Sequence, residues 1–403
     1  MSGSSGASIT LTMGDSMPAT DISPDRPAAE TARQGSPSLL AQCLRASRQD
    51  TLSHFEALEA VLPGLQVPSR PELNPPLWEL GHIGWFQQHW ISRNPQRHRG
   101  WDADPGAPQV DADDRLYDSS AVPHDSRWQL KLPDADALRA QLAAQLEQTL
   151  ACLQAQDSSD HRALYFHRLA LQHEDMHHEA ALYMAQHLGL PLQNAHWQAP
   201  VLPTPGPALD IPAGLLQLGA GMEDGFRFDN ELGHAVQQLA QFKIDAQVLR
   251  WAEYLPFVET GAGPVPRYLR REGRHWEQWR HGRWQLLDLH EPACHLSCHE
   301  AQSWCRWAGR RLPTEAEWVW ALRSSPERWR WGDVWEWTAS TFAPWPGFQP
   351  HPYRDYSLPW FDGRPVLRGA SFMTQPRVRH PDYRNFFPAT RSDIAAGFRS
   401  CAL

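Results

Sequence analysis

Residues 161–188 read HRALYFHRLALQHEDMHHEAALYMAQHL, the longest uninterrupted helical pattern in the chain. Within it, His173 and His177 are four positions apart, so both imidazoles leave the same face of a helix one turn apart. Glu179 lies about 200° round the helix from His177, which suits a structural role, or one that supports the metal ligands from behind, better than that of a ligand. This stretch therefore predicts a long helix that presents a pair of metal-binding side chains.

Three further helical patterns precede this stretch. They cover residues 39–62, 78–91 and 134–154, and Pro63 with Gly64 ends the first of them. A longer connection, residues 94–133, separates the second from the third. Four helices of this kind predict an antiparallel four-helix bundle over residues 37–198. Residues 1–36, rich in Ser, Thr, Pro, Ala and Asp, predict a disordered tail.

The carboxyl-terminal half has a different composition. Five prolines within residues 199–212 indicate an interdomain linker. Residues 213–403 show short strand-like pieces, many Gly and Trp, and only two clear helical patterns, 299–308 and 314–323. Thr314 and Glu317 form the capping box that opens the second. The predicted fold class is α+β with two domains, a helical bundle followed by a mixed, loop-rich α+β domain.

Charge and composition exclude several classes of protein. Of 403 residues, 37 are Lys or Arg and 46 are Asp or Glu, a formal net charge of −9. This acidic balance argues against a nucleic-acid-binding protein. No apolar run reaches the roughly 18 residues of a membrane span and no secretory signal is visible, so we expect a cytoplasmic protein without a membrane partner. The residues give no indication of an oligomeric state.

Several side chains of the carboxyl-terminal half are expected to be structural. Trp335 and Trp337 have strand spacing with both indoles on one face, which predicts core packing. Arg368 and Arg399 are expected to form internal ion pairs. The six cysteines are irregularly placed and predict no disulfide framework. Three of them are expected to be buried thiols rather than zinc ligands: Cys294, Cys298 and Cys305.

A third metal ligand has to come from another helix. His82, within residues 80–85 (LGHIGW), follows a small residue on a helix expected to face residues 161–188. His54 and His89 are rivals that spacing does not exclude. A lone apolar-face His is more often a hydrogen-bonded core residue, and a helical His pair is often solvated, but together they favour a three-His site. Three neutral imidazoles without a thiolate suit iron, copper or zinc and leave coordination positions open, which indicates catalysis at the metal.

Motifs in both halves resemble known families. Residues 310–318 (RRLPTEAEW), 332–338 (GDVWEWT), 367–372 (LRGASF) and 397–399 (GFR) resemble the formylglycine-generating-enzyme fold, a C-type-lectin-like relative. Residues 211–214 (IPAG) and 228–231 (FDNE) fit the start of that domain. The amino-terminal half, with Gly81-His82 and His-x-x-x-His-x-Glu, looks like a DinB-type four-helix bundle. Over residues 38–403, this pairing resembles the non-haem iron sulfoxide synthases of ergothioneine and ovothiol biosynthesis.

The resemblance implies a cofactor, substrates and site residues. A ferrous ion, Fe(II), would be held by His82, His173 and His177. Hercynine would bind near the iron with a sulfur donor, dioxygen would bind at an open position, and a carbon–sulfur bond would form at the imidazole carbon between the ring nitrogens. The family's active-site tyrosine lies in the loop after Trp-Glu-Trp-Thr, where Tyr353 is the first candidate and Tyr356 the second.

Departures from the family pattern bear on the substrates. Met176 stands where actinobacterial members commonly have Gln before the second helix histidine. Near the carboxyl end those members have Asn-Trp-Asp and then an Arg that grips γ-glutamylcysteine. Here Asn385, Phe386 and Phe387 precede Arg391. Because Phe387 replaces the acid that would pair with the donor's ammonium group, we expect a different donor. These five side chains are the predicted substrate-binding residues.

Residues 77–86 (LWELGHIGWF), 93–96 (RNPQ) and 117–120 (YDSS) look closest to the selenoneine synthase branch, whose members join hercynine to a 1-seleno-sugar. A neutral sugar needs no acidic clamp, Phe387 suits a sugar face, and Asn385 or Arg391 offers polar partners to hydroxyl groups. The leading hypothesis is Fe(II)- and dioxygen-dependent C–Se bond formation on hercynine.

Three alternatives belong to different classes. The first is an ergothioneine-type sulfoxide synthase that joins hercynine to cysteine or another thiol. The second is a formylglycine-generating enzyme, which would need a redox cysteine pair in the carboxyl-terminal domain. The third is a lectin-like binding module fused to a stabilising bundle, which leaves the three histidines unexplained.

Overall fold

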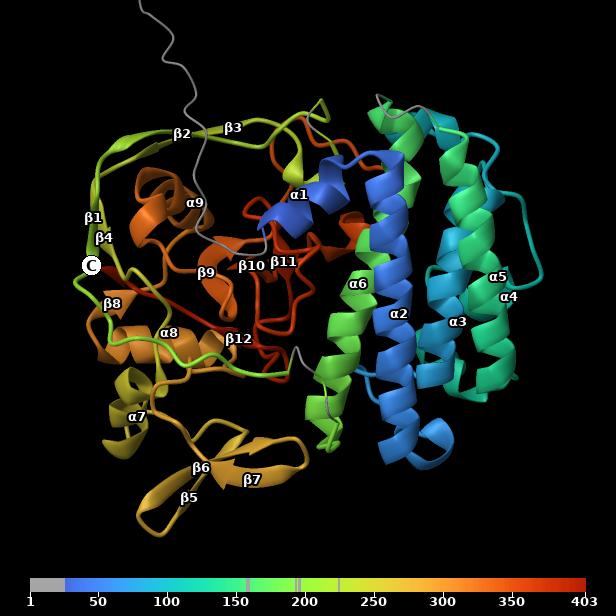
Figure 1. The fold of residues 1–403 in the computed structure, drawn as a ribbon. Coiled ribbons are helices and arrows are strands. Elements are labelled where there is room, and N and C mark those ends of the chain that lie inside the picture. Colours follow the sequence, from blue (N-terminus) through green and yellow to red (C-terminus); the bar gives the residue numbers. More distant parts are fainter. Residues whose placement is uncertain (1–25, 157–159, 193, 195–196, 224) are drawn as a thin grey trace, which may run out of the picture.

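The computed structural model describes residues 26–403 apart from 157–159, 193, 195–196 and 224. Two domains lie side by side: long helices form one, and small sheets with short helices form the other (Figure 1). Helix α6 (His161–Leu188) runs along the seam between them. The predicted α+β class with two domains is confirmed.

The amino-terminal domain is built on four long helices. They are α2 (Pro37–Val61), α3 (Pro76–Gln87), α5 (Ala135–Gln154) and α6. The Asp160 side chain caps α6 by accepting from the N–H groups of Arg162 and Ala163, and Gly189, with φ at +67°, ends it in the left-handed conformation. Helix α3 is shorter than predicted because the chain continues from it as a π-helical turn, Gln88–Ser92. The 94–133 connection holds α4 (Asp114–Tyr117) and two single turns, Arg97–Asp102 and His124–Gln129.

The carboxyl-terminal domain contains two four-stranded sheets. One has the order β1-β4-β13-β8 and the other β11-β10-β9-β12, in which only the β12–β9 pair is parallel. Their strands are β1 (Leu209–Ile211), β4 (Phe242–Ile244), β8 (Arg310–Arg311), β9 (Trp335–Thr341), β10 (Pro365–Gly369), β11 (Asn385–Phe386), β12 (Ala396–Gly397) and β13 (Cys401–Ala402). Two smaller antiparallel units are β2 (Gly214–Leu218) with β3 (Ala235–Leu239), and β5 (Leu269–Glu272), β6 (His275–Arg280) and β7 (Arg283–Leu286).

Three helices pack beside these sheets. Helices α8 (Cys298–Trp307) and α9 (Glu315–Ser324) match the two predicted patterns to within a residue or so. The predicted capping box of α9 is confirmed, because Thr314 Oγ1 accepts from the Glu317 N–H at 3.1 Å and Glu317 accepts from the Thr314 N–H at 2.8 Å. Helix α7 (Trp251–Glu259) was not predicted, since it is short and contains Pro256, a residue that usually breaks a helical pattern.

The prediction of a disordered tail over residues 1–36 is wrong for its last part. Residues 26–34 form α1 (Arg26–Gln34), while residues 1–25 lie outside the described residues. The physical reason is Arg33, whose guanidinium makes two hydrogen bonds of 2.7 and 2.9 Å to the buried carboxylate of Glu231. The N–H of Phe226 also donates to the Arg33 carbonyl at 2.9 Å. Helix α1 is thereby tied to the carboxyl-terminal domain.

The largest apolar core continues from one domain into the other. Trp85 and Phe166 of the bundle belong to the same cluster as Trp335 and Trp337 of β9, as the strand spacing of the two tryptophans predicted. The expected internal ion pairs are also confirmed: Arg399 binds Glu336 at 2.5 Å, and Arg368 lies 3.5 Å from Glu315.

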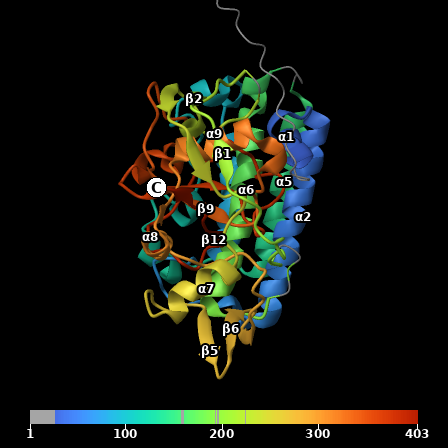
Figure 2. The same cartoon turned by 90° about the vertical axis from the view of Figure 1, so that its left-hand side faces the viewer.

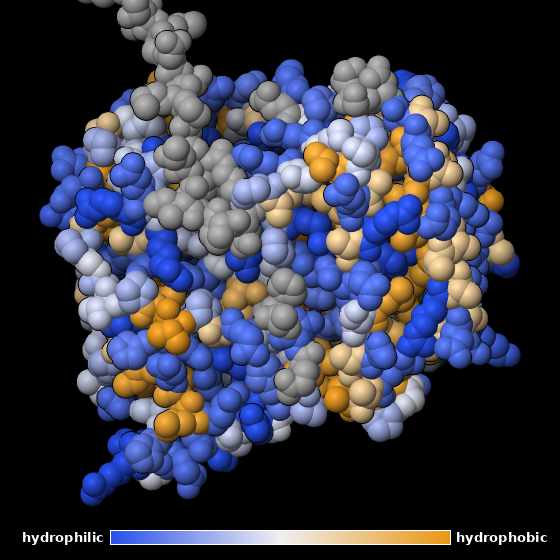
Figure 3. All heavy atoms as spheres, viewed as in Figure 1, coloured by the Kyte–Doolittle hydropathy of each residue, from blue (hydrophilic) through white to orange (hydrophobic). Residues whose placement is uncertain are grey.

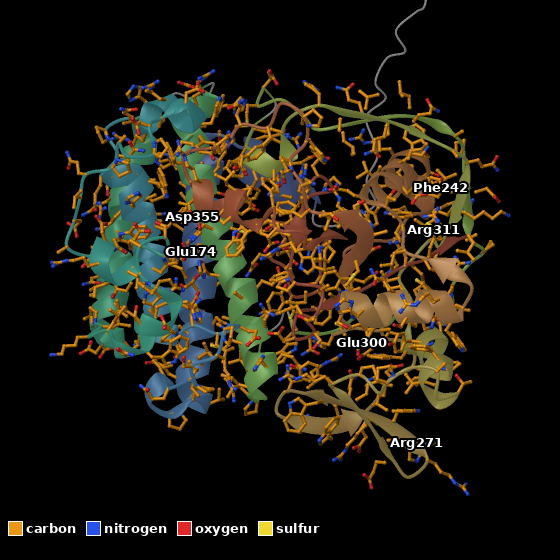
Figure 4. The ribbon with its side chains drawn as sticks, turned by 180° about the vertical axis from the view of Figure 1, so that it is seen from behind. Glu174, Phe242, Arg271, Glu300, Arg311 and Asp355 are labelled. Carbon is orange, nitrogen blue, oxygen red and sulfur yellow. The ribbon has the colours of Figure 1, made fainter. Side chains whose placement is uncertain are left out.

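The outer surface is mainly hydrophilic, with small separate apolar areas on the face shown in Figure 3. Sheet β5–β6–β7 projects from the body of the molecule in two perpendicular views (Figures 1 and 2). Arg271 lies on this projection, far from α6 (Figure 4). Among the described residues, no helix is long and apolar enough to cross a membrane.

Candidate metal centre

His82, His173 and His177 come together between α3 and α6. One ring nitrogen of each lies within 4.8 Å of those of the other two, and the Nε2 atoms of His173 and His177 are 3.2 Å apart. Two nitrogens that bind one ion at about 2.1 Å with an angle of roughly 90–110° lie about 3.0–3.4 Å apart. The three histidines thus form a cluster of a size that fits a single metal ion.

The position of His82 depends on close packing against the 94–133 connection. A Cβ atom on Gly81 would lie 2.2 Å from the Tyr117 ring, so only glycine allows this approach. Nδ1 of His82 donates to the carbonyl of Tyr117 at 2.7 Å, which leaves Nε2 free to bind a metal. The Trp78 ring stacks on His82 with 4.7 Å between centroids.

The two histidines of α6 are held from different sides. Nδ1 of His177 donates to the Glu79 carboxylate, whose other oxygen accepts from the Asn74 amide at 2.5 Å. The ring of His173 stacks on Phe86 with 3.6 Å between centroids and 5° between planes. A carboxylate behind an imidazole orients it and makes it a better metal ligand.

The protonation states fit a metal site. Burial lowers the pKa of His82 to about 3 and lowers the pKa of His173 well below its usual value. Both imidazoles are therefore neutral at pH 7, which is the form that binds metals. Burial alone would raise the pKa of Glu79, but His177, with smaller effects from His82 and Asn74, lowers it to about 2, so the carboxylate is ionised.

His54 and His89 lie outside this cluster. His54, on α2, packs edge-on against His178 with 5.0 Å between ring centroids, and its Nδ1 is 3.2 Å from the Asn194 amide. His89 packs on Trp85 at 4.8 Å, and its Nδ1 accepts from Arg93 at 3.1 Å. Neither His54 nor His89 belongs to the histidine cluster between α3 and α6.

The two candidate tyrosines occupy different positions near the cluster. The ring of Tyr353 lies 6.1 Å from that of His173 and 4.9 Å from that of Phe86. Tyr356 stacks on Phe228 at 4.1 Å. Burial raises the pKa of both phenols, so both keep their protons at neutral pH. Of the two, Tyr353 is the one whose ring contacts reach a clustered histidine.

Tyr383 links the second tyrosine to α6, and no motif in the sequence marked it. Its hydroxyl accepts from Tyr356 at 3.2 Å and donates to the sulfur of Met176 at 3.1 Å. Met176, a predicted substrate-binding residue, therefore lies on the seam beside His177. Its thioether is held by a phenol of the carboxyl-terminal domain.

Phe387 and Arg391 lie against the carboxyl-terminal part of α6. The Phe387 ring is 6.1 Å from that of Tyr183, and the Arg391 guanidinium is 5.3 Å from the Phe387 centroid. Arg391 is paired through Nε and Nη2 with Asp393, the second contact being 3.0 Å. Burial would raise the pKa of Asp393, but His187 and Arg391 lower it to about 2. Sequence reasoning missed this carboxylate, because no family motif marks it.

Asn385 and Phe386 are placed differently from the other predicted substrate-binding residues. Both belong to β11, which pairs with β10 inside the carboxyl-terminal domain. Asn385 Oδ1 accepts from the N–H of Phe386 at 2.9 Å, and Phe386 stacks on Phe342 at 4.1 Å. In the part of the chain that the structure describes, their hydrogen bonds and ring contacts run toward Tyr356 and the sheet rather than to α6.

A cavity inside the bundle also reaches the cluster. It has a volume of about 80 Å³ and lies between α2, α3 and α6. Glu79 and His177 form part of its wall. The rest is mainly apolar and includes Phe55, Leu58, Leu80, Ile83 and Met184.

Known protein families match both domains. Residues 43–189 match the DinB superfamily, and residues 198–333 and 330–402 match the Sulfatase-modifying factor enzyme 1-like domain. The hercynine oxygenase of Mycolicibacterium smegmatis is 30% identical over 436 aligned residues, which cover 89% of this chain and 97% of that protein. The chain belongs to the hercynine oxygenase family.

Other relatives differ in how much of this chain they match. The hercynine oxygenase of Mycobacterium tuberculosis is 28% identical and matches 82% of this chain and 91% of its own length. The formylglycine-generating enzyme of Streptomyces coelicolor is also 28% identical, but over only 32% of this chain and 54% of that enzyme. The hercynine oxygenases therefore share both domains with this chain. This confirms the predicted DinB-like bundle and formylglycine-generating-enzyme-like domain.

The four cysteines of the carboxyl-terminal domain are not paired with one another. Cys294, Cys298 and Cys305 are buried and free, as predicted, and Cys401 is buried and free as well. Burial raises the pKa of Cys298 to about 11 and the pKa values of the other three to about 12. Protonated thiols of this kind are unsuited to the redox pair that a formylglycine-generating enzyme needs.

Proposed function

We propose that this chain is a selenoneine synthase, an Fe(II)- and dioxygen-dependent enzyme that joins the imidazole carbon of hercynine to the selenium of a 1-seleno-sugar. The observation that carries the proposal is the cluster of three imidazoles from α3 and α6 in a member of the hercynine oxygenase family. Joining a C–H and an Se–H group releases two protons and two electrons, and dioxygen is the oxidant that accepts them.

The proposed metal ligands are His82, His173 and His177. Iron(II) bound by these imidazoles would supply the activation of dioxygen. Tyr353 is the proposed proton donor, because its phenol is protonated at neutral pH and its ring lies 6.1 Å from that of His173. Tyr356, whose hydroxyl donates to that of Tyr383, is the second candidate.

Two features at the α6 seam support a neutral donor. Phe387 stands where an acid would be needed to pair with the ammonium group of an amino-acid thiol. Arg391, the cation that would grip a donor carboxylate, is already paired with Asp393. An aromatic ring beside a neutralised cation suits a sugar, whose hydroxyl groups need polar partners but no counter-ion.

A competition assay tests the proposal. Protein loaded anaerobically with Fe(II) receives hercynine with equal amounts of cysteine, γ-glutamylcysteine, a 1-thio-sugar and a 1-seleno-sugar, and then air. Mass spectrometry identifies the adducts. His173→Ala is the blank, and His89→Ala is the matched control because His89 is a helical histidine outside the cluster.

We expect the seleno-sugar adduct to predominate, to be lost in His173→Ala and to be kept in His89→Ala. A predominant cysteine or γ-glutamylcysteine adduct would identify an ergothioneine-type sulfoxide synthase instead. Absence of every adduct, together with absence of iron binding, would contradict the enzyme proposal and favour a binding module.

A further inference from the structure

Arg127 is a buried cation beside the histidine cluster. It lies in the single turn His124–Gln129 of the 94–133 connection, with 8% of its surface exposed. Within the described part of the chain its guanidinium donates to Asn74 and to the carbonyls of Ser119 and Val122, and none of these partners is a carboxylate. Burying a charge out of contact with a carboxylate is costly, although the nearby negative charge of Glu79 offsets part of the cost, so the other contacts of Arg127 have to compensate for the lost water.

One set of contacts leads from Arg127 to His82. The Arg127 guanidinium lies 3.9 Å from the centroid of the Trp78 ring. The same indole stacks on His82 at 4.7 Å, with 11° between the two planes. Trp78 is fixed at its other end, because Nε1 donates to the Leu116 carbonyl at 2.7 Å. The cation–π contact therefore holds the Trp78 ring in place, and the stacked Trp78 ring in turn restricts the orientation of the His82 imidazole.

A second set of contacts leads from Arg127 to His177. Nη1 of Arg127 donates to Asn74 Oδ1 at 2.8 Å, and the Asn74 amide nitrogen donates to Glu79 Oε1 at 2.5 Å. The opposite oxygen of Glu79 accepts from His177 Nδ1. An arginine only donates hydrogen bonds, so it forces the amide oxygen toward itself and the NH₂ group toward Glu79.

We propose that Arg127 is a positioning residue that fixes two metal-ligating imidazoles at once, His82 through Trp78 and His177 through Asn74 and Glu79. The inference rests on the proposed metal site, and it adds a residue that touches neither the metal nor a ligand. Hydrogen-bonding groups behind metal ligands typically change metal affinity by about 10- to 100-fold. Because Arg127 supports two ligands, its loss is expected to weaken metal binding by a factor in this range.

Metal affinity measured without turnover tests this role. Arg127→Met removes the charge and the planar group but keeps an apolar stem over Trp78. Arg127→Lys keeps the charge but loses the flat fork. Arg364→Met is the matched control, because Arg364 lies 4.6 Å over Trp360 in the carboxyl-terminal domain. Anaerobic titration with Co(II) gives the dissociation constant, and the visible spectrum of the Co(II) protein reports ligand geometry.

We expect a 10- to 100-fold weaker dissociation constant and a changed Co(II) spectrum for Arg127→Met. A smaller loss is expected for Arg127→Lys and no change for Arg364→Met. Asn74→Leu breaks only the path to His177 and is expected to weaken binding less than Arg127→Met. Circular dichroism of the metal-free proteins checks folding. If Arg127→Met does not fold, the test rests on Arg127→Lys and Asn74→Leu. Each of them is expected to bind Co(II) more weakly than the parent protein, and unchanged binding in both would contradict the role of Arg127.

Three results would count against this inference or against the proposed metal site, and they can be told apart. An affinity for Arg127→Met within twofold of the parent, while His173→Ala loses the metal, would overturn the role of Arg127 and leave the site standing. Tighter binding in Arg127→Met would show that the guanidinium acts by charge repulsion, which also overturns it. Unchanged Co(II) binding in His173→Ala would instead refute the three-histidine site.

Discussion

One carboxylate oxygen of Glu179 accepts several hydrogen bonds that join the two domains. Its Oε1 accepts from Trp335 at 2.8 Å, from Ser371 at 2.8 Å and from Thr374 at 3.0 Å. It also accepts from Tyr183 of its own helix. The angle of Glu179 relative to the histidine pair predicted a structural role, and these contacts agree with it.

Removing this acceptor is expected to be strongly destabilising. In Glu179→Ala several buried donors lose their partner, and each unsatisfied buried group costs about 1–3 kcal/mol. We expect the free energy of unfolding in urea to fall by at least about 3 kcal/mol. Glu179→Gln, which keeps one acceptor oxygen, should lose less. A loss no larger than that of the exposed control Glu56→Ala would contradict this account.

Asp393 controls whether Arg391 is available to a donor. In Asp393→Asn the guanidinium loses its counter-ion and becomes free to bind a donor carboxylate. A charged hydrogen bond is worth about 1.5–3 kcal/mol, which corresponds to roughly 10- to 100-fold in kcat/KM. We expect the preference for cysteine over the 1-seleno-sugar to rise by about that factor. The control is Asp362→Asn, which breaks the Arg364 pair elsewhere. An unchanged preference would mean that Arg391 does not contact the donor.

The segment that carries Tyr353 and Tyr356 is hydrogen-bonded to the carboxyl group of Asp229, and this group titrates at mildly acidic pH. Asp229 accepts from the Ser357 hydroxyl at 2.5 Å and from the His351 N–H at 3.4 Å. Burial raises the pKa of Asp229 to about 6, with a smaller effect from Glu231, although these hydrogen bonds oppose the rise. Between about pH 4 and pH 6 the folded protein therefore holds this proton more tightly than the unfolded chain does.

Because of this difference, the contribution of Asp229 to the free energy of unfolding falls as the pH rises. The contribution of Asp229 to stability is fully present below about pH 4 and is lost as pH rises through about 6. Asp229→Asn cannot ionise, so its free energy of unfolding relative to the parent should rise by up to about 3 kcal/mol from pH 4 to pH 7.5. Urea unfolding across this range measures it. A difference that does not change with pH would refute the assignment.

Elements with their own periodicity were predictable, and elements formed by distant contacts were not. The long helices α2, α5 and α6 follow from apolar spacing and caps. Helix α1 does not, because Arg33 and Glu231 are 198 positions apart. The two-residue strands β11, β12 and β13 likewise exist only through partners that are remote in sequence.

The same distinction applies to the site. The His173 and His177 pair follows from spacing within one helix. His82 was the best third candidate because it lies on a helix expected to face residues 161–188, and the family resemblance implied the same residue. Tyr383 and Arg127 were missed because their partners lie on other elements, and Asp393 because no family motif marks it although Arg391 is only two positions away. Such contacts leave no periodic signal in the sequence.

At the scale of the whole molecule, the two domains behave as one packed unit. The largest apolar cluster contains residues of both domains, and α6 contributes to both sides of the seam. The linker is also attached, because Leu202 is buried and its N–H donates to the His290 carbonyl at 2.9 Å. The prolines that follow Leu202 are exposed. A cut there should leave the two halves together.

A protease site inserted between Pro205 and Gly206 tests this expectation. After cleavage the two fragments should co-elute in size-exclusion chromatography and unfold in one thermal transition, because the shared core and the Glu179 contacts remain. The same cut in Glu179→Ala should release the fragments more readily. Separate elution of the fragments from the otherwise unchanged protein would show that the linker, and not the seam, holds the domains together.

Helix α6 presents His173 and His177 to α3 and, on another face, Met176, Glu179 and Tyr183 to the carboxyl-terminal domain. Insertions or substitutions that shift its register would therefore disturb the histidines and the domain seam in the same step. Recombination between relatives should succeed only when the crossover lies after Gly189, and only when the incoming domain matches the outward face of α6. Relatives that use a different donor are thus expected to differ in the loops and side chains around α6, while α6 itself keeps its length and register.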